Sequence, residues 1–405
     1  MKRAVGIELR RGVGICTFVP MLIALVFITL AHLRQWAGDW LGWAYYQRTS
    51  LIVFGPLVVA AAAWQGGRER RRGLVELLAS TARGPLQRTT AALASPAAWA
   101  LLAFGIVTAA MAAVTARNTS YGRPPALLTL GAVAAVLLFA VVGYAAGRAS
   151  PWRITAPVLA LATYVALGVG NYGPSYLSPG VQLFSGLEPA PWWPLASAGS
   201  FLLAALGVLL LLGHRSRWFA VPVLGLAWLV ALPIANAGQD AFTPDVAGEA
   251  LVCQDGSPQV CLTRRHDDQL PAVSAEVQRV LAGLDIPGPL NEQRFGVRSE
   301  ETTLNTLYLG AAIDGSSDLE VVRQDAAQAA VRWRCAEGGP YSPDDDLGIA
   351  TFELTDWILR RPEPPYAGLL AGRSEPQALA LIREFRAAAE RCDLPAARAA
   401  LPVSP

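Results

Sequence analysis

Long apolar runs dominate the first 240 residues and do not recur after them. A helix needs roughly 20 apolar residues to cross the hydrocarbon core of a bilayer, and seven runs approach that length. They lie near residues 13–33, 50–66, 96–116, 126–147, 154–171, 197–213 and 218–237. The second and fifth runs are short for a span. The pattern predicts a polytopic α-helical membrane domain over residues 1–240, with about seven transmembrane helices.

The remaining chain has a different pattern, typical of a small α+β domain over residues 241–405. Helical periodicity and strand-like runs alternate there, and Ser374 before Glu375-Pro376 is a helix start signal. We expect helices at 271–284, 318–334, 346–361 and 375–392, and strands near 293–298 and 303–309. Of the 31 acidic residues, 26 lie from Asp240 onward, which indicates a water-soluble domain after the membrane part.

Composition and charge agree with this division. The chain is 53% hydrophobic and only 16% charged, which is too apolar for soluble domains alone. The net charge of +2 does not indicate nucleic-acid binding, because the arginines of the first part lie in short loops. Lys2 is the only lysine among 33 basic residues, a composition typical of bacteria with GC-rich genomes. We therefore expect a bacterial plasma (inner) membrane protein.

The basic residues of the membrane part fall on alternate loops, fourteen on one side and four on the other. Loops rich in arginine and lysine stay in the cytoplasm. This rule predicts a cytoplasmic amino terminus, and seven spans then make the C-terminal domain extracellular. The first side receives Lys2, Arg3, Arg10, Arg11, Arg68, Arg70, Arg71, Arg72, Arg83, Arg88, Arg148, Arg153, Arg215 and Arg217, and the second receives Arg34, Arg48, Arg117 and Arg123.

None of the seven apolar runs has an Asp, Glu, Lys or Arg in its middle. Carriers that use ion gradients usually need such groups within the membrane, so the sequence favours a driving force from elsewhere. Small residues such as Gly143 and Gly147 suit close helix packing, with or without a specific dimer interface.

The loop over residues 68–85, between the second and third runs, has the pattern of a short amphipathic helix. Leu74, Leu77, Leu78 and Thr81 recur at helical spacing on one face, with charged residues on the others. A short helix of this kind at the cytoplasmic surface can bind a partner protein. An alternative is that it binds anionic lipid through its arginines.

This loop resembles the coupling helix of the permease subunits of type-2 ATP-binding cassette (ABC) exporters. In that family a Glu, a Gly-Thr, a Leu-Glu-Leu-Leu and a Ser-Thr-Pro follow one another; here Leu74 replaces the usual Thr and Ala82 the usual Pro. The resemblance covers residues 1–213. The residues that it assigns to ATPase coupling are Glu69, Gly73, Leu74, Glu76, Leu77, Leu78, Ser80 and Thr81.

The resemblance implies an export permease whose partner is a separate ABC ATPase subunit, with two permeases, identical or different, forming the conduit in the lipid bilayer. The chain contains no GxxxxGK[ST] phosphate loop. We therefore expect no cofactor on this chain, ATP and magnesium on the partner, and no enzymatic activity of its own. In this family the segment that corresponds to residues 171–194 forms short re-entrant helices; an interfacial aromatic anchor is the alternative.

Four cysteines lie in the C-terminal domain, on the side of the membrane where disulfides persist. Cys253 and Cys261 flank a turn signal at Asp255-Gly256-Ser257-Pro258, so we expect them to pair across a hairpin, which leaves Cys335 with Cys392. Cys16 is expected in the core. Zinc binding is the alternative, but no CxxC motif occurs, so we predict no metal site.

The C-terminal domain has no recognisable catalytic set. His266, beside Asp267 and Asp268, has the pattern of a solvated loop. We therefore expect this domain to be a binding or gating accessory. A second hypothesis for the whole chain is a non-transporting membrane protein whose outer domain senses a ligand or assists envelope assembly.

Overall fold

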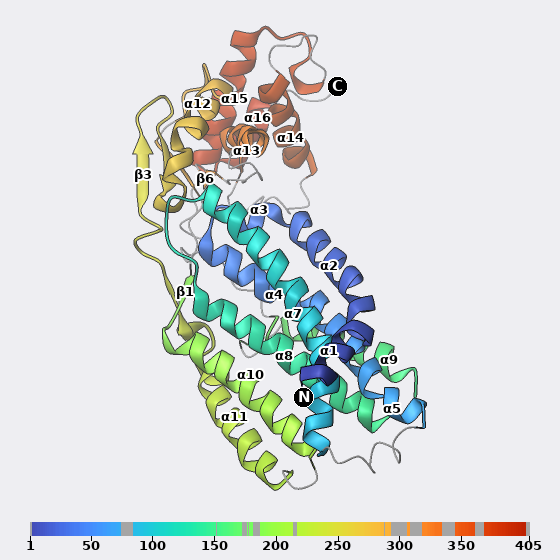
Figure 1. Cartoon of the computed structure of the whole chain (residues 1–405). Helices are drawn as coiled ribbons and strands as arrows, with labels where there is room; N and C mark the ends of the chain where they lie inside the picture. Colours follow the sequence, from blue (N-terminus) through green and yellow to red (C-terminus); the bar gives the residue numbers. More distant parts are fainter. Residues whose placement is uncertain are drawn as a thin grey trace. The chain divides into compact units, whose positions relative to one another are not determined.

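The fold is taken from a computed structural model of the chain, which divides into two compact units (Figure 1). The membrane unit contains Met1–Ala116 and Arg123–Pro244, and the C-terminal unit contains Arg117–Gly122 and Asp245–Pro405. The structure describes residues 2–73, 84–150, 152–171, 176, 178–180, 187–213, 217–286, 288–292, 306–307, 318–333, 345–360 and 368–401.

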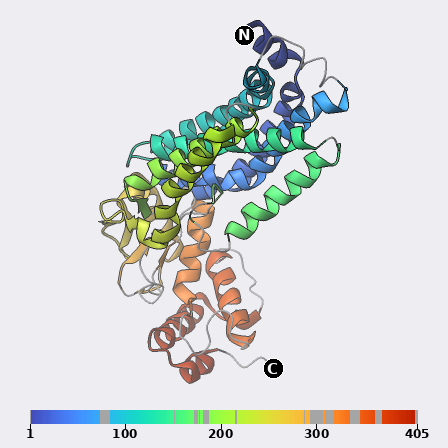
Figure 2. The same cartoon turned by 90° about the horizontal axis from the view of Figure 1, so that it is seen from below.

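The membrane unit is helical, and its long helices run side by side in both views (Figure 1 and Figure 2). Its elements are α1 (Lys2–Arg11), α2 (Val13–Ala31), α3 (Leu33–Trp36), α4 (Trp40–Gly66), α5 (Arg68–Arg71), α7 (Pro85–Asn118), α8 (Ala126–Ala149), α9 (Thr155–Asn171), β1 (Leu187–Pro189), α10 (Trp192–Leu211), α11 (Arg217–Ala237), the 3-10 turn η1 (Gly238–Ala241) and β2 (Phe242–Pro244). The last two residues of α7 fall in the C-terminal unit.

Six of the described helices are long and apolar enough to cross a membrane, namely α2, α4, α7, α8, α10 and α11. Helix α9 is apolar but has only 17 residues. The prediction of a multi-pass helical membrane protein is therefore confirmed, with six candidate spans.

Helices α4 and α8 are the most buried of the six candidate spans and pack directly on each other. Glycines make this approach close: a Cβ atom on Gly143 would lie 2.4 Å from the Val59 carbonyl oxygen, and one on Gly147 would lie 2.0 Å from that of Ala63. The spaced glycines therefore serve packing within the chain. Helix α9 packs along α4, α10 along α8, and α11 along α10.

Aromatic rings join α7 to the same group of helices. Trp99 lies 5.2 Å from Phe18 on α2, and Phe104 lies 5.9 Å from Phe54 on α4, between ring centroids. The second span begins earlier than its apolar run predicts, because Asp39 caps α4 by accepting from the backbone N–H groups of Leu41 and Gly42. Nearly three extra turns of α4 precede residue 50.

The assignment of Arg48 to an outer loop is wrong, because α4 contains Arg48 and buries it. The apolar run missed this turn because Gln47, Arg48 and Thr49 are polar, although neighbouring helices cover Gln47 and Arg48.

The C-terminal unit is α+β, as predicted. A four-stranded sheet has the order β3-β4-β5-β6, antiparallel between β3 and β4 and parallel elsewhere. The helices cover an apolar core that contains Leu262, Val277, Leu290, Ala326 and Phe385. The elements are β3 (Leu251–Gln254), β4 (Val260–Thr263), the 3-10 turn η2 (Arg264–Gln269), α12 (Leu270–Val280), β5 (Leu290–Glu292), β6 (Thr306–Leu307), α13 (Leu319–Val331), α14 (Asp345–Arg360), the 3-10 turn η4 (Gly368–Leu370), α15 (Glu375–Glu390) and α16 (Leu394–Ala400).

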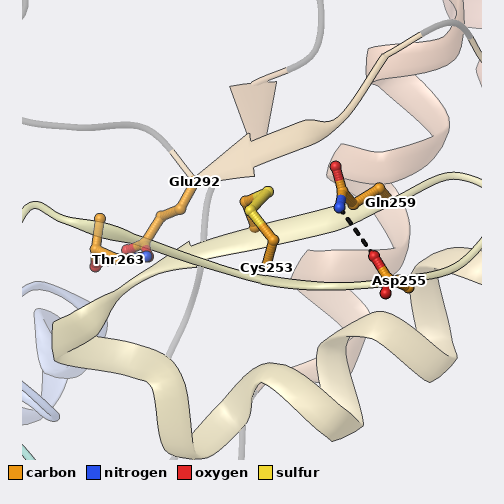
Figure 3. The surroundings of a disulfide bond; sticks show 6 residues. Cys253, Asp255, Gln259, Thr263 and Glu292 are labelled. Atoms are coloured by element: carbon orange, nitrogen blue, oxygen red, sulfur yellow. Dashed lines mark hydrogen bonds between the residues drawn. A yellow bond between two sulfur atoms is a disulfide. The ribbon is translucent and has the colours of Figure 1, made fainter.

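A disulfide joins Cys253 to Cys261 at facing positions of β3 and β4 (Figure 3), the pairing expected from the turn signal between them. Cys392 is also disulfide-bonded, and its expected partner Cys335 lies outside the described residues. Cys16, expected in the core, is instead exposed on α2, a peripheral helix whose outer face is apolar and suited to lipid.

Candidate functional site

The predicted coupling loop is described at its two ends. Glu69 and Gly73 lie in and directly after α5, whereas Leu74, Glu76, Leu77, Leu78, Ser80 and Thr81 lie outside the described residues. The candidate site is therefore built from the two flanks of the loop, α5 on one side and the first turns of α7 on the other. We call this end of the membrane unit the arginine end.

Glu8 connects α1 to the start of the loop. One carboxylate oxygen of Glu8 accepts from Arg68 at 2.6 Å, and the other accepts from the side-chain amide of Gln65 at 3.1 Å. An ion pair of this kind contributes little free energy when exposed, but this one is partly buried and hydrogen-bonded on both oxygens. It therefore sets the position of α1 relative to the end of α4.

The junction between α1 and α2 is held against α7. A Cβ atom on Gly12 would lie 2.3 Å from the hydroxyl oxygen of Ser95, and one on Gly14 would lie 2.6 Å from its carbonyl oxygen. The indole N–H of Trp99 donates to the carbonyl of Leu9 at 2.9 Å. Only glycine allows this approach, so the amino-terminal helix is packed onto the helix that follows the loop.

Arginines from α5 and from the last turn of α8 meet at the same end. Arg70 donates to the carbonyl of Ala149 at the end of α8 at 3.0 Å, and Arg148 donates to the hydroxyl of Thr89 on α7 at 2.6 Å. The guanidinium of Arg71 lies 4.5 Å from the ring centroid of Trp64, a cation–π contact.

The pKa of Arg71 is lowered in this crowded group of cations. Burial is the larger cause, and repulsion from Arg153 and Arg72 adds to it. Because neighbouring positive charges repel one another, this cluster favours binding to an anionic surface, either of a protein or of lipid headgroups.

Gly73 marks where the described base of the loop ends. Its backbone has a φ of +66°, a left-handed conformation that favours glycine, and its N–H donates to the carbonyl of Arg70 at 3.1 Å. Gly73 therefore stops the helical turn of α5 and redirects the chain into the predicted coupling segment. Glu69 is half-buried within that turn.

No family model, curated protein or solved structure matches this chain. Any inference about the role of the loop therefore rests on the contacts above and on the pattern of its residues.

Sequence reasoning missed two residues of the membrane unit. Glu8 is the single carboxylate before Asp39, on an amphipathic basic segment, and that isolation was an available signal. Arg48 was available through the capping signal of Asp39, followed by the aromatic stretch Trp40–Tyr46.

A second polar cluster lies within the C-terminal unit. Asp245 accepts from Arg265 at 3.0 Å and from the hydroxyl of Tyr121 at 3.1 Å, and Ser120 donates to Asp267 at 2.8 Å. These bonds explain why residues 117–122, which include the end of α7 and the start of the loop to α8, belong to this unit. The cluster anchors that connecting loop.

His266 is not the solvated loop residue that was expected. Its Nδ1 lies 2.6 Å from Glu292, whose other oxygen accepts from the backbone and hydroxyl of Thr263. Figure 3 shows Glu292 reaching from β5 toward Thr263 on β4. The imidazole joins η2 to the sheet. Within the described ranges no group of three His, Cys, Asp or Glu side chains is arranged to hold a metal ion.

Proposed function

We propose that this chain is the permease subunit of an ATP-driven ABC exporter, which binds a separate ATPase through residues 68–85. The observation that carries the proposal is the attachment of both flanks of this loop to helices of the membrane unit. A force applied to the loop would reach α1 through Glu8 and Arg68, and α8 through Arg70 and Arg148. A loop that couples ATP hydrolysis to transport requires such connections, whereas a simple lipid anchor does not.

The amino-terminal helix α1 supports the same proposal. It is amphipathic and basic, precedes the first candidate span, and is tied to the loop by the carboxylate of Glu8. Two such permeases would form the conduit, and ATP with magnesium would be bound by the partner ATPase.

We also propose that α9 crosses the membrane, which makes seven crossings. Helix α8 ends at the arginine end, where Arg70 contacts Ala149. Helix α10 begins at the opposite end, where Ser197 contacts Arg48 near the start of α4. The chain must pass from one end to the other between them, and α9 packs along α4 in that interval. Its 17 residues span about 25 Å, a few ångströms less than the roughly 30 Å of a typical hydrocarbon core.

The sidedness follows from the positive-inside rule. Because loops rich in arginine tend to stay inside, this rule favours a cytoplasmic location for the arginine end. With seven crossings the chain leaves α11 on the outer side, where the disulfide of the C-terminal unit would persist. Residues 117–122, which follow the third crossing, belong to that unit and so share its side.

Two single cysteines test this topology in a Cys16→Ser background. In intact cells a membrane-impermeant maleimide should label Val246→Cys, which is 79% exposed in the C-terminal unit, and should label Trp152→Cys only after lysis. If Val246→Cys also requires lysis, α9 does not cross. If Trp152→Cys is labelled in intact cells, the orientation is reversed.

Co-purification tests the exporter proposal. The tagged chain, purified from its host in mild detergent, should retain a protein with a phosphate loop, and the complex should hydrolyse ATP. A Glu76→Arg, Leu78→Asp double variant should lose the ATPase, and Val246→Asp, an exposed change in the other unit, should keep it. If folded wild-type protein retains no ATPase, the exporter proposal fails and the outer unit becomes the candidate for ligand sensing.

A further inference from the structure

Arg48 is a charged side chain buried among the helices of the membrane unit. It lies on candidate span α4 with 1% of its surface exposed. The nearest carboxylate along the chain, Asp39, caps α4, and Glu8 binds Arg68 at the other end of the unit. Among the described residues no carboxylate pairs with Arg48. An arginine keeps its charge in proteins, so this cation is buried without a counter-ion from the described residues.

The contacts of Arg48 leave most of its hydrogen-bonding capacity unused. One terminal nitrogen donates to the hydroxyl of Ser197 at 3.3 Å, and the other donates to the carbonyl of Ser178 at 3.4 Å. Both bonds are longer than the usual 2.9–3.0 Å. The Nε–H has no partner in the part of the chain that the structure describes. A buried cation with two long bonds to neutral groups is costly unless something else binds it.

Within the described ranges, other buried polar groups beside Arg48 are also unpaired. They are the hydroxyl of Ser178 and the indole N–H of Trp193, whose ring centroid lies 4.8 Å from the guanidinium carbon of Arg48. Unpaired donors around one cation are the pattern expected of a site that receives an anionic group.

The surroundings also have an apolar wall and a small residue beside the charge. Phe242 lies 5.2 Å from Trp193 and 5.3 Å from Tyr176, between ring centroids. On α8, a Cβ atom at Gly131 would lie 3.1 Å from a terminal nitrogen of Arg48. The absence of a side chain at Gly131 therefore lets the guanidinium lie close to the backbone of α8.

We propose that Arg48 binds the anionic head group, a carboxylate or a phosphate, of an amphiphile that reaches α4 from the bilayer. The guanidinium would donate to two oxygens at once, the aromatic wall would contact the apolar body, and Trp193 would donate its N–H. The proposal concerns binding by this chain alone. It rests on the proposed function only in that this amphiphile would be the exported substrate.

The test uses dodecyl phosphate as the probe, titrated into the purified full chain in dodecyl maltoside and counted by native mass spectrometry. Wild-type protein should bind it, and Arg48→Met should bind it about tenfold to a hundredfold more weakly, the loss expected for a charge-assisted contact. Arg123→Met removes the same charge from an exposed arginine of the membrane unit that lies outside this site and outside the arginine end, and it should bind as wild type does.

Thermal unfolding of the ligand-free proteins separates this site from a structural role of Arg48. If Arg48 serves to bind an anion, ligand-free Arg48→Met should be at least as stable as wild type, because the substitution removes an uncompensated buried charge. Equal binding by wild type and Arg48→Met, no binding by wild type, or clear destabilisation of ligand-free Arg48→Met would each overturn the proposal.

Inorganic phosphate distinguishes the source of the anion. It should not displace dodecyl phosphate at equal concentration. If it does, Arg48 binds free anions, and the proposal that its ligand is an amphiphile is wrong. All these measurements omit the ATPase, so a failure to co-purify one leaves them unchanged. Conversely, if the ATPase co-purifies but Arg48→Met binds dodecyl phosphate as well as wild type does, the binding site is overturned and the exporter proposal is not.

Discussion

Replacing Gly147 by alanine should loosen the contact between α4 and α8, the two most buried candidate spans. The added methyl carbon would lie 2.0 Å from the carbonyl oxygen of Ala63 and 2.6 Å from its carbonyl carbon. Real Cβ contacts essentially never fall below 3.0 Å. Because both atoms are backbone, no side chain can rotate away, and the helices must separate by about 1 Å, the scale of gap that forfeits a quarter to a half of each dispersion contact.

Helix association in a bilayer depends strongly on dispersion contacts, since lipid tails are as apolar as the side chains. We expect Gly147→Ala to lower the free energy of unfolding by about 1–3 kcal/mol, the range for overpacked interiors. Gly105 on α7 is the matched control, because a Cβ atom there meets nothing within 4 Å. Gly105→Ala should be neutral or stabilise by up to about 1 kcal/mol through helix propensity.

Reversible unfolding in mixed micelles, with increasing sodium dodecyl sulfate and tryptophan fluorescence as the signal, measures both variants against wild type. The sign of the difference is the test. If Gly147→Ala is as stable as Gly105→Ala, α4 and α8 do not pack through this glycine, and the helix arrangement described above is wrong at its centre.

Three further predictions concern the C-terminal unit. Arg265→Met removes the arginine that pairs with the buried carboxylates of Asp245 and Glu249 and should cost about 3–5 kcal/mol in thermal unfolding, whereas Arg360→Met, which removes an exposed pair with Asp356, should change little. The pKa of Glu276 is lowered, chiefly by a hydrogen bond from Arg279. Its contribution to stability is therefore complete above its ordinary pKa of 4.5 and is lost as pH falls through the lowered value; melting temperatures followed over acidic pH should show this loss in wild type and not in Glu276→Gln. A Cys253→Ser, Cys261→Ser variant should lose about 2–3 kcal/mol, because the disulfide closes a loop with a sequence separation of 8, and equal urea midpoints for variant and wild type would contradict that value.

Local patterns in the sequence predicted much of the architecture. Apolar runs located the six long helices, because a bilayer imposes a minimum length and hydropathy on any span. The helices of the C-terminal unit and its hairpin disulfide followed from periodicity and a turn signal, which also act over short distances. These features depend on residues that are close in the chain.

The loop over residues 68–85, predicted to couple to an ATPase, is an intermediate case. Its pattern predicted a partner-binding helix, but the attachment of its flanks depends on Glu8 and Arg68, which are 60 residues apart. A lone acidic residue in a basic segment does not specify which arginine it meets, so this contact required the tertiary structure.

By itself, then, the sequence determined that this is a multi-pass helical membrane protein followed by a disulfide-containing α+β region. The tertiary structure decided which apolar faces are buried, because hydropathy does not distinguish a face that meets lipid from one that meets another helix. It also decided that Arg48 is enclosed, through contacts with Ser197, 149 residues away, and with Trp193. A buried charge is defined by what surrounds it, and that is set by residues distant in the chain.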